Sequence, residues 1–385
     1  FHAAYNTRII CIRGVKPSKK RGLIAMITIS LCMIVKNEED VLARCLDSVG
    51  GLADEIIVID TGSTDATKEI ALKYTNLVYD FTWIDDFSAA RNYSFSKGTM
   101  QYLMWLDADD VLLESDKNML LALKETLPED TDVVMMRYNT ALDESGKPLF
   151  SFYRERLLRR EAGFKWKGAV HEAIETFGKK YYSEAAVTHA KLKQSEPGRN
   201  LRIYEKLISQ GAVLTGRDLF YYSRELYYDG RDEDAEKAFM EYLEQKGGFI
   251  ENKIEACRFL SFCRYRLKKD SEALQALLKS LKYDRPRAEL CCDIGKHYLD
   301  RNSPENALPW FELALNIKRN DASGAFVLPD CYDYIPLIQL CVCYDRLGNI
   351  AAAEECNRMA GLLKPFSPAY QHNKRYFENK KSKQQ

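Results

Sequence analysis

The chain has 385 residues, 46% of them hydrophobic, and its 56 Lys and Arg residues balance its 56 Asp and Glu residues. This length and apolar content can fill the cores of two domains. The balanced charge lacks the clustered basic surface of a nucleic-acid-binding protein, so we exclude a nucleic-acid partner. No apolar run approaches the length of a membrane-spanning helix, so we expect no membrane span.

The cysteines do not form the pattern of a disulfide framework, because there are eleven of them and no paired CxxC spacing occurs. Several fall at apolar positions with helical spacing, namely Cys257, Cys263, Cys291 and Cys341. We therefore expect buried, reduced thiols in a cytoplasmic protein.

Residues 1–25 contain six Lys or Arg residues and no acidic residue. No apolar core long enough for a secretory signal follows these charges. We interpret the segment as disordered, or as sequence added upstream of a natural start at Met26. A basic arm that contacts a partner is the alternative.

Short apolar runs alternate with segments of helical periodicity over the first third of the chain. The expected strands are residues 27–35, 55–60, 76–80, 102–107 and 132–139, and the clearest helices are residues 38–49 and 65–74. Alternation of buried strands with helices is typical of a mostly parallel sheet with helices on both faces. The sequence therefore predicts an N-terminal α/β domain with a Rossmann-like sheet.

The character of the chain changes twice after this region. Residues 150–195 predict short polar and aromatic strands, and the SEPGR segment at 195–199 has the Pro and Gly of a boundary. Beyond it the chain is helical. The predicted divisions are a basic segment at 1–25, an α/β domain at 26–195, a helical repeat domain at 196–370 and a polar tail at 371–385.

The helical part carries a repeat. Ala235, Ala273, Ala307 and Ala353 lie 38, 34 and 46 residues apart, and Phe239, Leu277, Phe311 and Asn357 follow them four residues later. The period, with small residues where helices approach and aromatics beside them, resembles the tetratricopeptide (TPR) family over residues 217–366. Such solenoids form extended concave surfaces, so we expect this domain to hold a macromolecular acceptor and to be the site of any homodimer contact.

The strongest chemical signal follows the expected strand 102–107. Asp107-Ala108-Asp109-Asp110 stands where that strand ends, and ligands of open parallel sheets bind at the carboxyl ends of strands. Two carboxylates there can hold a divalent ion against a diphosphate. A solvated acidic turn is the alternative.

Two further strand ends and one helix supply polar groups to the same edge. Asp60 could accept a hydrogen bond from a uracil or a ribose, and the first strand ends in Val35-Lys36-Asn37-Glu38. Arg91 lies on a helix ahead of the fourth strand, and its fork of donors suits a pyrimidine or a phosphate. A turn with a helix cap and an ordinary surface arginine are the alternatives.

The segments MIVKNEE, DTGSTD, FSAARN and LDADD, in this order, resemble the family 2 glycosyltransferases of GT-A fold over residues 27–195. With the TPR-like tail, the chain resembles the sublancin-type bacteriocin peptide glycosyltransferases, although its segment before the first strand is short. The resemblance implies an inverting hexosyltransferase that uses Mn²⁺ or Mg²⁺ and a UDP-sugar, of the UDP-glucose or UDP-GlcNAc type. It also implies that Asp60 contacts the base, Asp107 the ribose or metal, and Asp109 the metal. The full set expected to contact the nucleotide sugar is Val35, Asn37, Glu38, Asp60, Arg91, Asp107 and Ala108.

Two histidines and a glutamate complete the expected site. His189 ends an expected strand, and we favour it as a third metal ligand beside Asp107 and Asp109. His171 and Glu172 lie in a Gly-flanked aromatic segment that suits the floor of an acceptor pocket. Inverting transfer needs a base, for which we choose Glu172, with Asp110 and Glu155 as alternatives. These two residues, Glu172 and His171, are the predicted catalytic pair.

The predicted function is transfer of a sugar from a UDP-sugar to a Ser, Thr or Cys side chain of a peptide or protein held by the helical domain. One alternative is a transferase of cell-surface or lipid-linked glycan synthesis. Another, of a different class, is a non-catalytic nucleotide-binding TPR scaffold.

Overall fold

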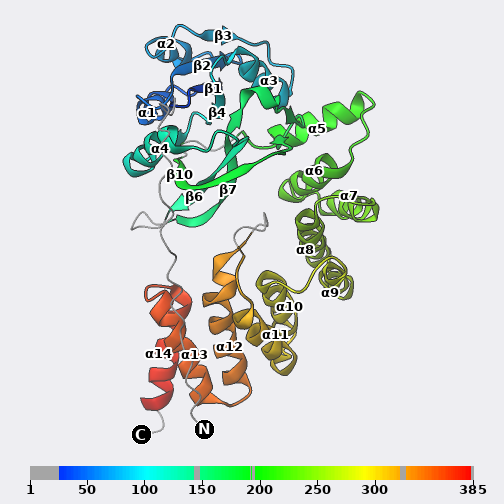
Figure 1. Cartoon of the computed structure of the whole chain (residues 1–385). Coiled ribbons are helices and arrows are strands. Elements are labelled where there is room, and N and C mark those ends of the chain that lie inside the picture. Colours follow the sequence, from blue (N-terminus) through cyan, green and yellow to red (C-terminus); the bar gives the residue numbers. More distant parts are fainter. Residues whose placement is uncertain (1–25, 143–147, 191, 193–195, 321–326, 383–385) are drawn as a thin grey trace, which may run out of the picture.

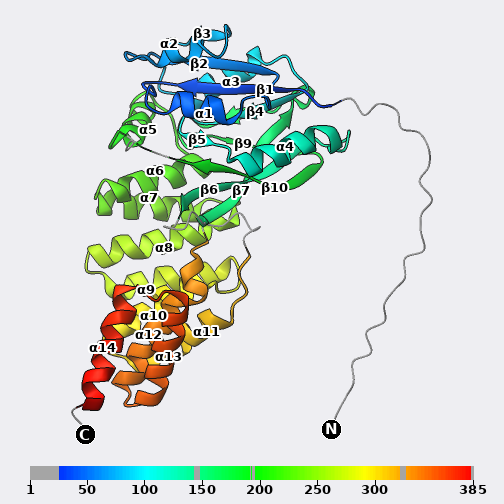
Figure 2. The same cartoon turned by 90° about the vertical axis from the view of Figure 1, so that its left-hand side faces the viewer.

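The computed structural model describes residues 26–142, 148–190, 192, 196–320 and 327–382. An α/β domain stands at one end, and a curved stack of helices descends from it to the C-terminal helix α14 (Figures 1 and 2). The expectations for residues 1–25 lie outside the described residues, and the domain boundaries stay predictions.

The α/β domain is built on an eight-stranded sheet with the order β3-β2-β1-β4-β7-β6-β10-β5. Its strands are β1 (Ile29–Val35), β2 (Glu55–Asp60), β3 (Val78–Asp80), β4 (Tyr102–Trp105), β5 (Asp110–Val111), β6 (Val133–Leu142), β7 (Pro148–Arg159) and β10 (Lys180–His189). The strands β3, β2, β1 and β4 are parallel, and so are β6 and β10; β7 runs antiparallel between β4 and β6. The five strands expected before residue 140 are confirmed.

Helices cover both faces of this sheet, as expected. They are α1 (Leu42–Ser48), α2 (Thr67–Leu72), α3 (Phe87–Lys97) and α4 (Glu114–Thr126). The core on one face includes Leu42 and Leu46 of α1 and Leu120 and Leu123 of α4. The core on the other face contains Phe95 of α3.

The segment from 148 to 189 differs from the short strands we expected. β7 and β10 are long strands of the main sheet, and only β8 (Trp166–Lys167) and β9 (Ala173–Ile174) are short. The reason lies in the apolar residues of both strands, because Leu157, Leu158, Ala185 and Val187 are buried against the two cores. In β7 the apolar pattern is interrupted by arginines, and in β10 it is confined to the second half of the strand.

The C-terminal domain consists of helical hairpins. Its helices are α5 (Arg199–Ser209), α6 (Gly216–Tyr228), α7 (Asp232–Glu244), α8 (Ile250–Arg266), α9 (Asp270–Lys279), α10 (Ala288–Asp300), α11 (Pro304–Asn316), α12 (Tyr334–Arg346), α13 (Ile350–Leu363) and α14 (Pro368–Ser382). The pairs α6/α7, α8/α9, α10/α11 and α12/α13 pack as successive hairpins. This is the stacking expected of a TPR-like repeat.

The repeat residues occupy the positions that the pattern predicts. All four alanines, Ala235, Ala273, Ala307 and Ala353, have no exposed surface, and their partners four residues later are buried. Gly295 of α10 shows why a small residue is needed, because a Cβ there would lie 2.7 Å from Cζ of Phe311 on α11. Close approach of the two helices therefore depends on this glycine.

The first helices of the repeat share a core with the α/β domain. Val170 is buried in one cluster with Tyr204, Phe220 and Phe239, and Trp83 and Phe87 pack against that cluster. A side chain of α5 also crosses the junction, because Lys206 forms an ion pair with Asp85. The helical domain is thus joined to the α/β domain by an interface with both apolar and polar contacts.

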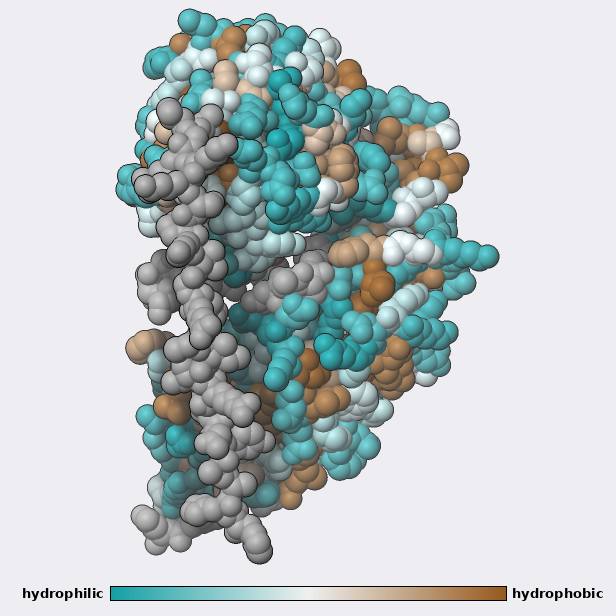
Figure 3. All heavy atoms as spheres, in the orientation of Figure 1, coloured by the Kyte–Doolittle hydropathy of each residue, from teal (hydrophilic) through white to brown (hydrophobic). Residues whose placement is uncertain are grey.

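Two remaining expectations concern cysteines and membranes. Of the ten cysteines in the described ranges, nine are buried and all are unpaired. Within those ranges no helix is both long and apolar enough to cross a membrane. Figure 3 shows a mainly hydrophilic surface on one side of the molecule, with hydrophobic residues in small separate groups.

Candidate functional site

Several of the predicted site residues lie where the parallel strands end. The segment after β4 turns into the short strand β5, and β5 pairs antiparallel with the end of β10, so that Asp110 stands opposite His189. Residues far apart in the sequence, 107–110 and 189, are brought together by this pairing. The strand ends β1 and β2 lie on the same side of the sheet.

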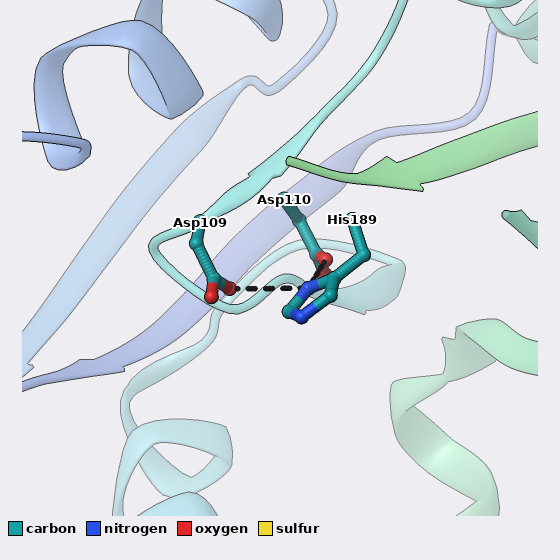
Figure 4. A group of neighbouring side chains, drawn as sticks. All are labelled: Asp109, Asp110 and His189. Atoms are coloured by element: carbon teal, nitrogen blue, oxygen red, sulfur yellow. Dashed lines mark ion pairs between the residues drawn. The ribbon is translucent and has the colours of Figure 1, made fainter. Parts of the chain in front are cut away.

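Asp109, Asp110 and His189 form a cluster that could hold a metal ion (Figure 4). One ligand atom from each residue lies within 4.8 Å of those of the other two. Nδ1 of His189 is 3.4 Å from Oδ1 of Asp109 and 3.5 Å from Oδ1 of Asp110. That nitrogen is buried and makes no hydrogen bond with a described residue, so the donor set fits a divalent cation.

The charges of this cluster also fit a cation. Asp109, and then Asp110, raise the pKa of His189 to about 9. A metal bound there would replace the proton that the two carboxylates otherwise attract. The cluster is partly open to solvent at Asp109 and His189, whereas Asp110 is fully buried.

Asp110 forms an ion pair and a hydrogen bond with two buried side chains that were not predicted from the sequence. Its Oδ2 lies 3.1 Å from Nη1 of Arg156 in an ion pair whose side chains have no exposed surface, and the hydroxyl of Tyr138 donates to its Oδ1 at 3.0 Å. The guanidinium of Arg156 also stacks on Trp105, 3.7 Å from the ring centroid. Arg156 lies in the sequence RERLLRR, residues 154–160. Its burial could have been inferred only if this segment had been recognised as part of the long strand β7.

Asp107 belongs to a different network. Nη2 of Arg91 lies 2.7 Å from Oδ1 of Asp107, and Nε of the same guanidinium lies 2.6 Å from Oε1 of Glu172. Burial is the largest influence and by itself would raise the pKa of Asp107, but the charge and hydrogen bond of Arg91, together with the charges of Arg156 and Arg154, lower that pKa overall. The side chain of Asp107 is therefore paired with Arg91 and is not part of the cluster of Asp109, Asp110 and His189.

Two tryptophans fix the Arg91 side chain. Its guanidinium carbon lies 5.2 Å from the ring centroid of Trp105 and 4.8 Å from that of Trp166, and the two rings meet edge to face. Burial would lower the pKa of Arg91, but Asp107 and Glu172 raise it. Arg91 is therefore a permanent, immobile cation at this edge, and neither tryptophan was predicted as part of the site.

The ends of β1 and β2 form a second, adjoining part of the edge. Oδ1 of Asp60 accepts hydrogen bonds from the backbone N–H groups of Gly62 and Ser63, each at 2.7 Å. Its Oδ2 is buried and makes no hydrogen bond with a described residue. A buried carboxylate oxygen without a partner is costly unless a ligand supplies a donor.

The loop after β1 is tied to the loop after β2. Asn37 has a left-handed backbone, with φ of 55°, and its Oδ1 accepts from the N–H of Thr64 at 2.8 Å. The N–H of Glu38 donates to Oγ1 of Thr67 at 2.7 Å, and the carbonyl of Val35 accepts from the N–H of Thr61 at 3.0 Å. These contacts shape the two loops together.

The remaining predicted residues fall in separate places. Ala108 is buried between Asp107 and Asp109. His171 faces away from the cluster, with Nε2 2.6 Å from Oε1 of Glu225 on α6. Glu155 pairs with Arg154 at 3.1 Å.

Part of the chain is similar to known proteins. Residues 30–178 match a family model described as Glycosyl transferase family 2. The match covers the whole edge just described except His189. Residues 30–178 are therefore similar to family 2 glycosyltransferase domains, and a TPR-like helical domain follows them.

Individual relatives are similar over part of their length. The chain is 36% identical over 152 residues to a TPR repeat-containing protein of Synechococcus elongatus, covering 39% of this chain and 36% of that protein. It is 28% identical over 223 residues to the glycosyltransferase SunS from an SPbeta prophage of Bacillus subtilis, covering 54% of this chain and 51% of that protein. The chain thus spans about half or less of the length of these curated relatives.

Among solved structures, the chain is similar to a glucosyl-3-phosphoglycerate synthase from Mycobacterium tuberculosis. The sequence identity is 24%, the TM-score is 0.27, and the similarity covers 32% of this chain and 49% of that chain.

Proposed function

We propose that this protein is a metal-dependent, inverting glycosyltransferase that moves a sugar from a UDP-sugar to a Ser, Thr or Cys side chain of a peptide or protein. The observation that carries the proposal is the sheet edge of a family 2 domain, where Asp109, Asp110 and His189 form one acidic cluster. Beside it, Arg91 joins Asp107 to Glu172. An acidic cluster next to a fixed cation suits a diphosphate bound through a divalent ion.

The nucleotide lies, in this proposal, along the ends of β1 and β2. Oδ2 of Asp60, buried and without a hydrogen bond to a described residue, accepts from the N–H of the uracil ring. The backbone around Val35, Asn37 and Glu38 forms the wall beside the base, because hydrogen bonds to residues 61–67 hold it in place. Asp107 and Ala108 then reach the ribose.

The residues present fit a divalent metal. Asp109 and His189 would hold it together with Asp110, and Asp107 is the remaining predicted ligand. When bound, Mn²⁺ or Mg²⁺ would offset charge on the departing diphosphate. His189 favours Mn²⁺, because imidazole is a better ligand for transition metals than for Mg²⁺.

The transfer is a single displacement that the side chains of this chain arrange. Glu172 takes the proton of the acceptor hydroxyl or thiol, and the acceptor oxygen or sulfur forms a bond to the anomeric carbon. The bond from that carbon to the diphosphate oxygen breaks, and UDP leaves with the electron pair. Attack from the face opposite UDP inverts the configuration. Arg91 orients the Glu172 carboxylate and stands beside the leaving group.

The presence of the helical domain is an argument for a polypeptide acceptor. Its stacked hairpins form a continuous curved array that begins at the glycosyltransferase domain (Figure 1). Arrays of this kind provide extended surfaces that match extended peptide segments better than small glycans.

A binding screen followed by a turnover assay tests the proposal. UDP with Mn²⁺ should raise the melting temperature more than GDP or CMP with Mn²⁺, since a ligand at 100 times its Kd stabilises a protein by about 2.7 kcal/mol. Slow hydrolysis of UDP-glucose or UDP-GlcNAc without acceptor should follow. A protein that binds UDP but hydrolyses neither sugar nucleotide, with or without peptides, would instead be a nucleotide-binding scaffold.

A further inference from the structure

The loop that carries Glu172 is held from two domains at once. It lies between β8 and β9, and the side chains of two successive residues leave it in different directions. Glu172 contacts Arg91 of the glycosyltransferase domain at 2.6 Å, whereas His171 contacts Glu225 of the helical domain, also at 2.6 Å. The loop is therefore the point where the helical domain meets the candidate catalytic centre.

Three groups of helix α6 hold His171. Besides the contact with Glu225, its ring stacks on Tyr221, with centroids 4.2 Å apart and planes at 17°. Its carbonyl oxygen accepts a hydrogen bond from Nε of Arg217 at 3.0 Å. From α5, Asn200 donates to the same oxygen of Glu225 at 3.2 Å, which fixes that carboxylate in turn.

The backbone at His171 depends on these contacts. Its φ is 51°, in the left-handed region that non-glycine residues rarely adopt. Such a conformation persists only where its surroundings impose it. Because the conformation of residue 171 sets the direction of residue 172, the contacts on α6 also determine where Glu172 points.

The carboxylates in these two contacts are shielded from solvent. The side chains of Glu172 and Glu225 are 12% and 16% exposed. Burial would raise the pKa of Glu225, but the hydrogen bonds from His171 and Asn200 lower it. Contacts of this kind are worth more than surface ion pairs, whose contribution is close to zero.

We propose that Glu225, through His171, is a positioning residue that keeps Glu172 against Arg91, so that the helical domain completes the catalytic site in addition to any docking of the acceptor. This inference rests on the proposed function for its effect on turnover, but its structural part does not. His171 thereby becomes an anchor of the loop, and Glu172 alone faces the reacting groups.

The test uses the full chain and compares Glu225→Ala with Glu312→Ala. Glu312 is a matched control, because it accepts a hydrogen bond from a ring side chain, Tyr344, within the helical domain and away from the loop. Three quantities are measured for each protein: deuterium uptake of the peptide containing residues 168–173, and kcat and KM for UDP-glucose hydrolysis without acceptor.

Glu225→Ala should raise deuterium uptake of the loop and lower kcat by about 10–100-fold, since misplacement of a catalytic group by about 1 Å costs that much. KM for UDP-glucose should not change, because the hydrogen bonds described for Asp60 and the contacts of His189 with Asp109 and Asp110 lie within the α/β domain. Glu225→Gln keeps a hydrogen-bond acceptor for His171, so its loop deuterium uptake and kcat should stay close to those of the unaltered protein. Glu312→Ala should change neither quantity.

Unchanged loop exchange in Glu225→Ala overturns the inference, whatever the activity. A fall in kcat that is equal in Glu225→Ala and Glu312→Ala also overturns it, since that result reports general destabilisation. If the unaltered protein turns over neither UDP-glucose nor UDP-GlcNAc, the proposed function fails, and loop exchange still decides whether Glu225 positions the loop.

Discussion

Nε of Arg91 lies 2.6 Å from Oε1 of Glu172, and this pair joins α3 to a loop 81 residues further along the chain. The second arm of the guanidinium is engaged with Asp107, at 2.7 Å. The arginine therefore fixes the distance between the end of β4 and the loop that carries Glu172. Its own position is set by the rings of Trp105 and Trp166.

The role of Glu172 as base predicts a specific loss in Glu172→Gln. The amide oxygen can still accept from Arg91, so shape and UDP affinity should be retained, while kcat falls by about 10²–10⁴-fold because the proton acceptor is gone. The loss should be smaller for a thiol acceptor, which is already partly ionised near neutral pH. Steady-state kinetics with a Ser and a Cys peptide measure both effects.

Glu175→Gln is the control for that variant. Glu175 lies three residues further along the chain, directly after β9, and forms an exposed ion pair with Lys167. Its substitution should leave kcat unchanged. Near-native transfer to the Ser peptide by Glu172→Gln would show that the base lies elsewhere, with Asp110 and Glu155 as the remaining candidates.

Asp60→Asn should weaken nucleotide binding. The Asn oxygen can still accept from Gly62 and Ser63, but its amide nitrogen replaces the free oxygen and faces the uracil N–H as a second donor. A hydrogen bond to a charged group contributes about 1.5–3 kcal/mol, so Kd for UDP should rise about 10–100-fold. Isothermal titration measures this Kd, and the exposed Asp130→Asn serves as control. An unchanged Kd would show that the uracil ring does not bind at Asp60.

Arg156→Met should destabilise the fold strongly. It leaves Asp110 fully buried with a charge whose nearest cation has been removed, although Tyr138 still donates to it. Breaking one partner of a buried ion pair costs about 3–5 kcal/mol. Urea unfolding measures the loss, and adding Asp110→Asn should recover part of it. A loss below about 1 kcal/mol would mean that Asp110 does not need this arginine.

Gly295→Ala should destabilise the repeat even though alanine favours helices. Its Cβ would meet the Phe311 ring at 2.7–2.9 Å, and the ring is fully buried. Overpacking costs about 1–3 kcal/mol, more than the gain of about 1 kcal/mol in helix propensity. A smaller side chain in Phe311→Leu should offset the clash, so the two changes together should cost less than their sum in thermal unfolding. Additive effects would contradict the close contact.

The fold was largely predictable from the sequence, because periodicity reports directly on burial. The strand ends at Asp60 and Asp107 followed from apolar runs, and the repeat followed from Ala235 and its equivalents. The pairing of side chains was not predictable in the same way. Nothing in the spacing of FSAARN shows that Arg91 reaches both Asp107 and Glu172, since those contacts depend on tertiary packing of α3 against β8.

The direction of His171 was hidden for a related reason. Periodicity cannot show a left-handed residue in a short loop, and the residue that receives its ring, Tyr221, lies in the other domain. The cluster of Asp109, Asp110 and His189 matches the predicted ligand set only in part. Asp109 and His189 were expected together with Asp107, whereas the place of Asp110 depends on the pairing of β5 with β10.

The central claim is that a divalent ion at Asp109 and His189 joins the nucleotide to the protein. The most direct measurement is the Kd of UDP in Mn²⁺ and in EDTA, for the unaltered protein and for Asp109→Ala. The account predicts that Mn²⁺ tightens UDP binding to the unaltered protein by about 5–150-fold, the usual range for coupled ligands, and that Asp109→Ala loses this dependence while remaining folded. Equal UDP affinity with and without Mn²⁺ in both proteins would contradict it.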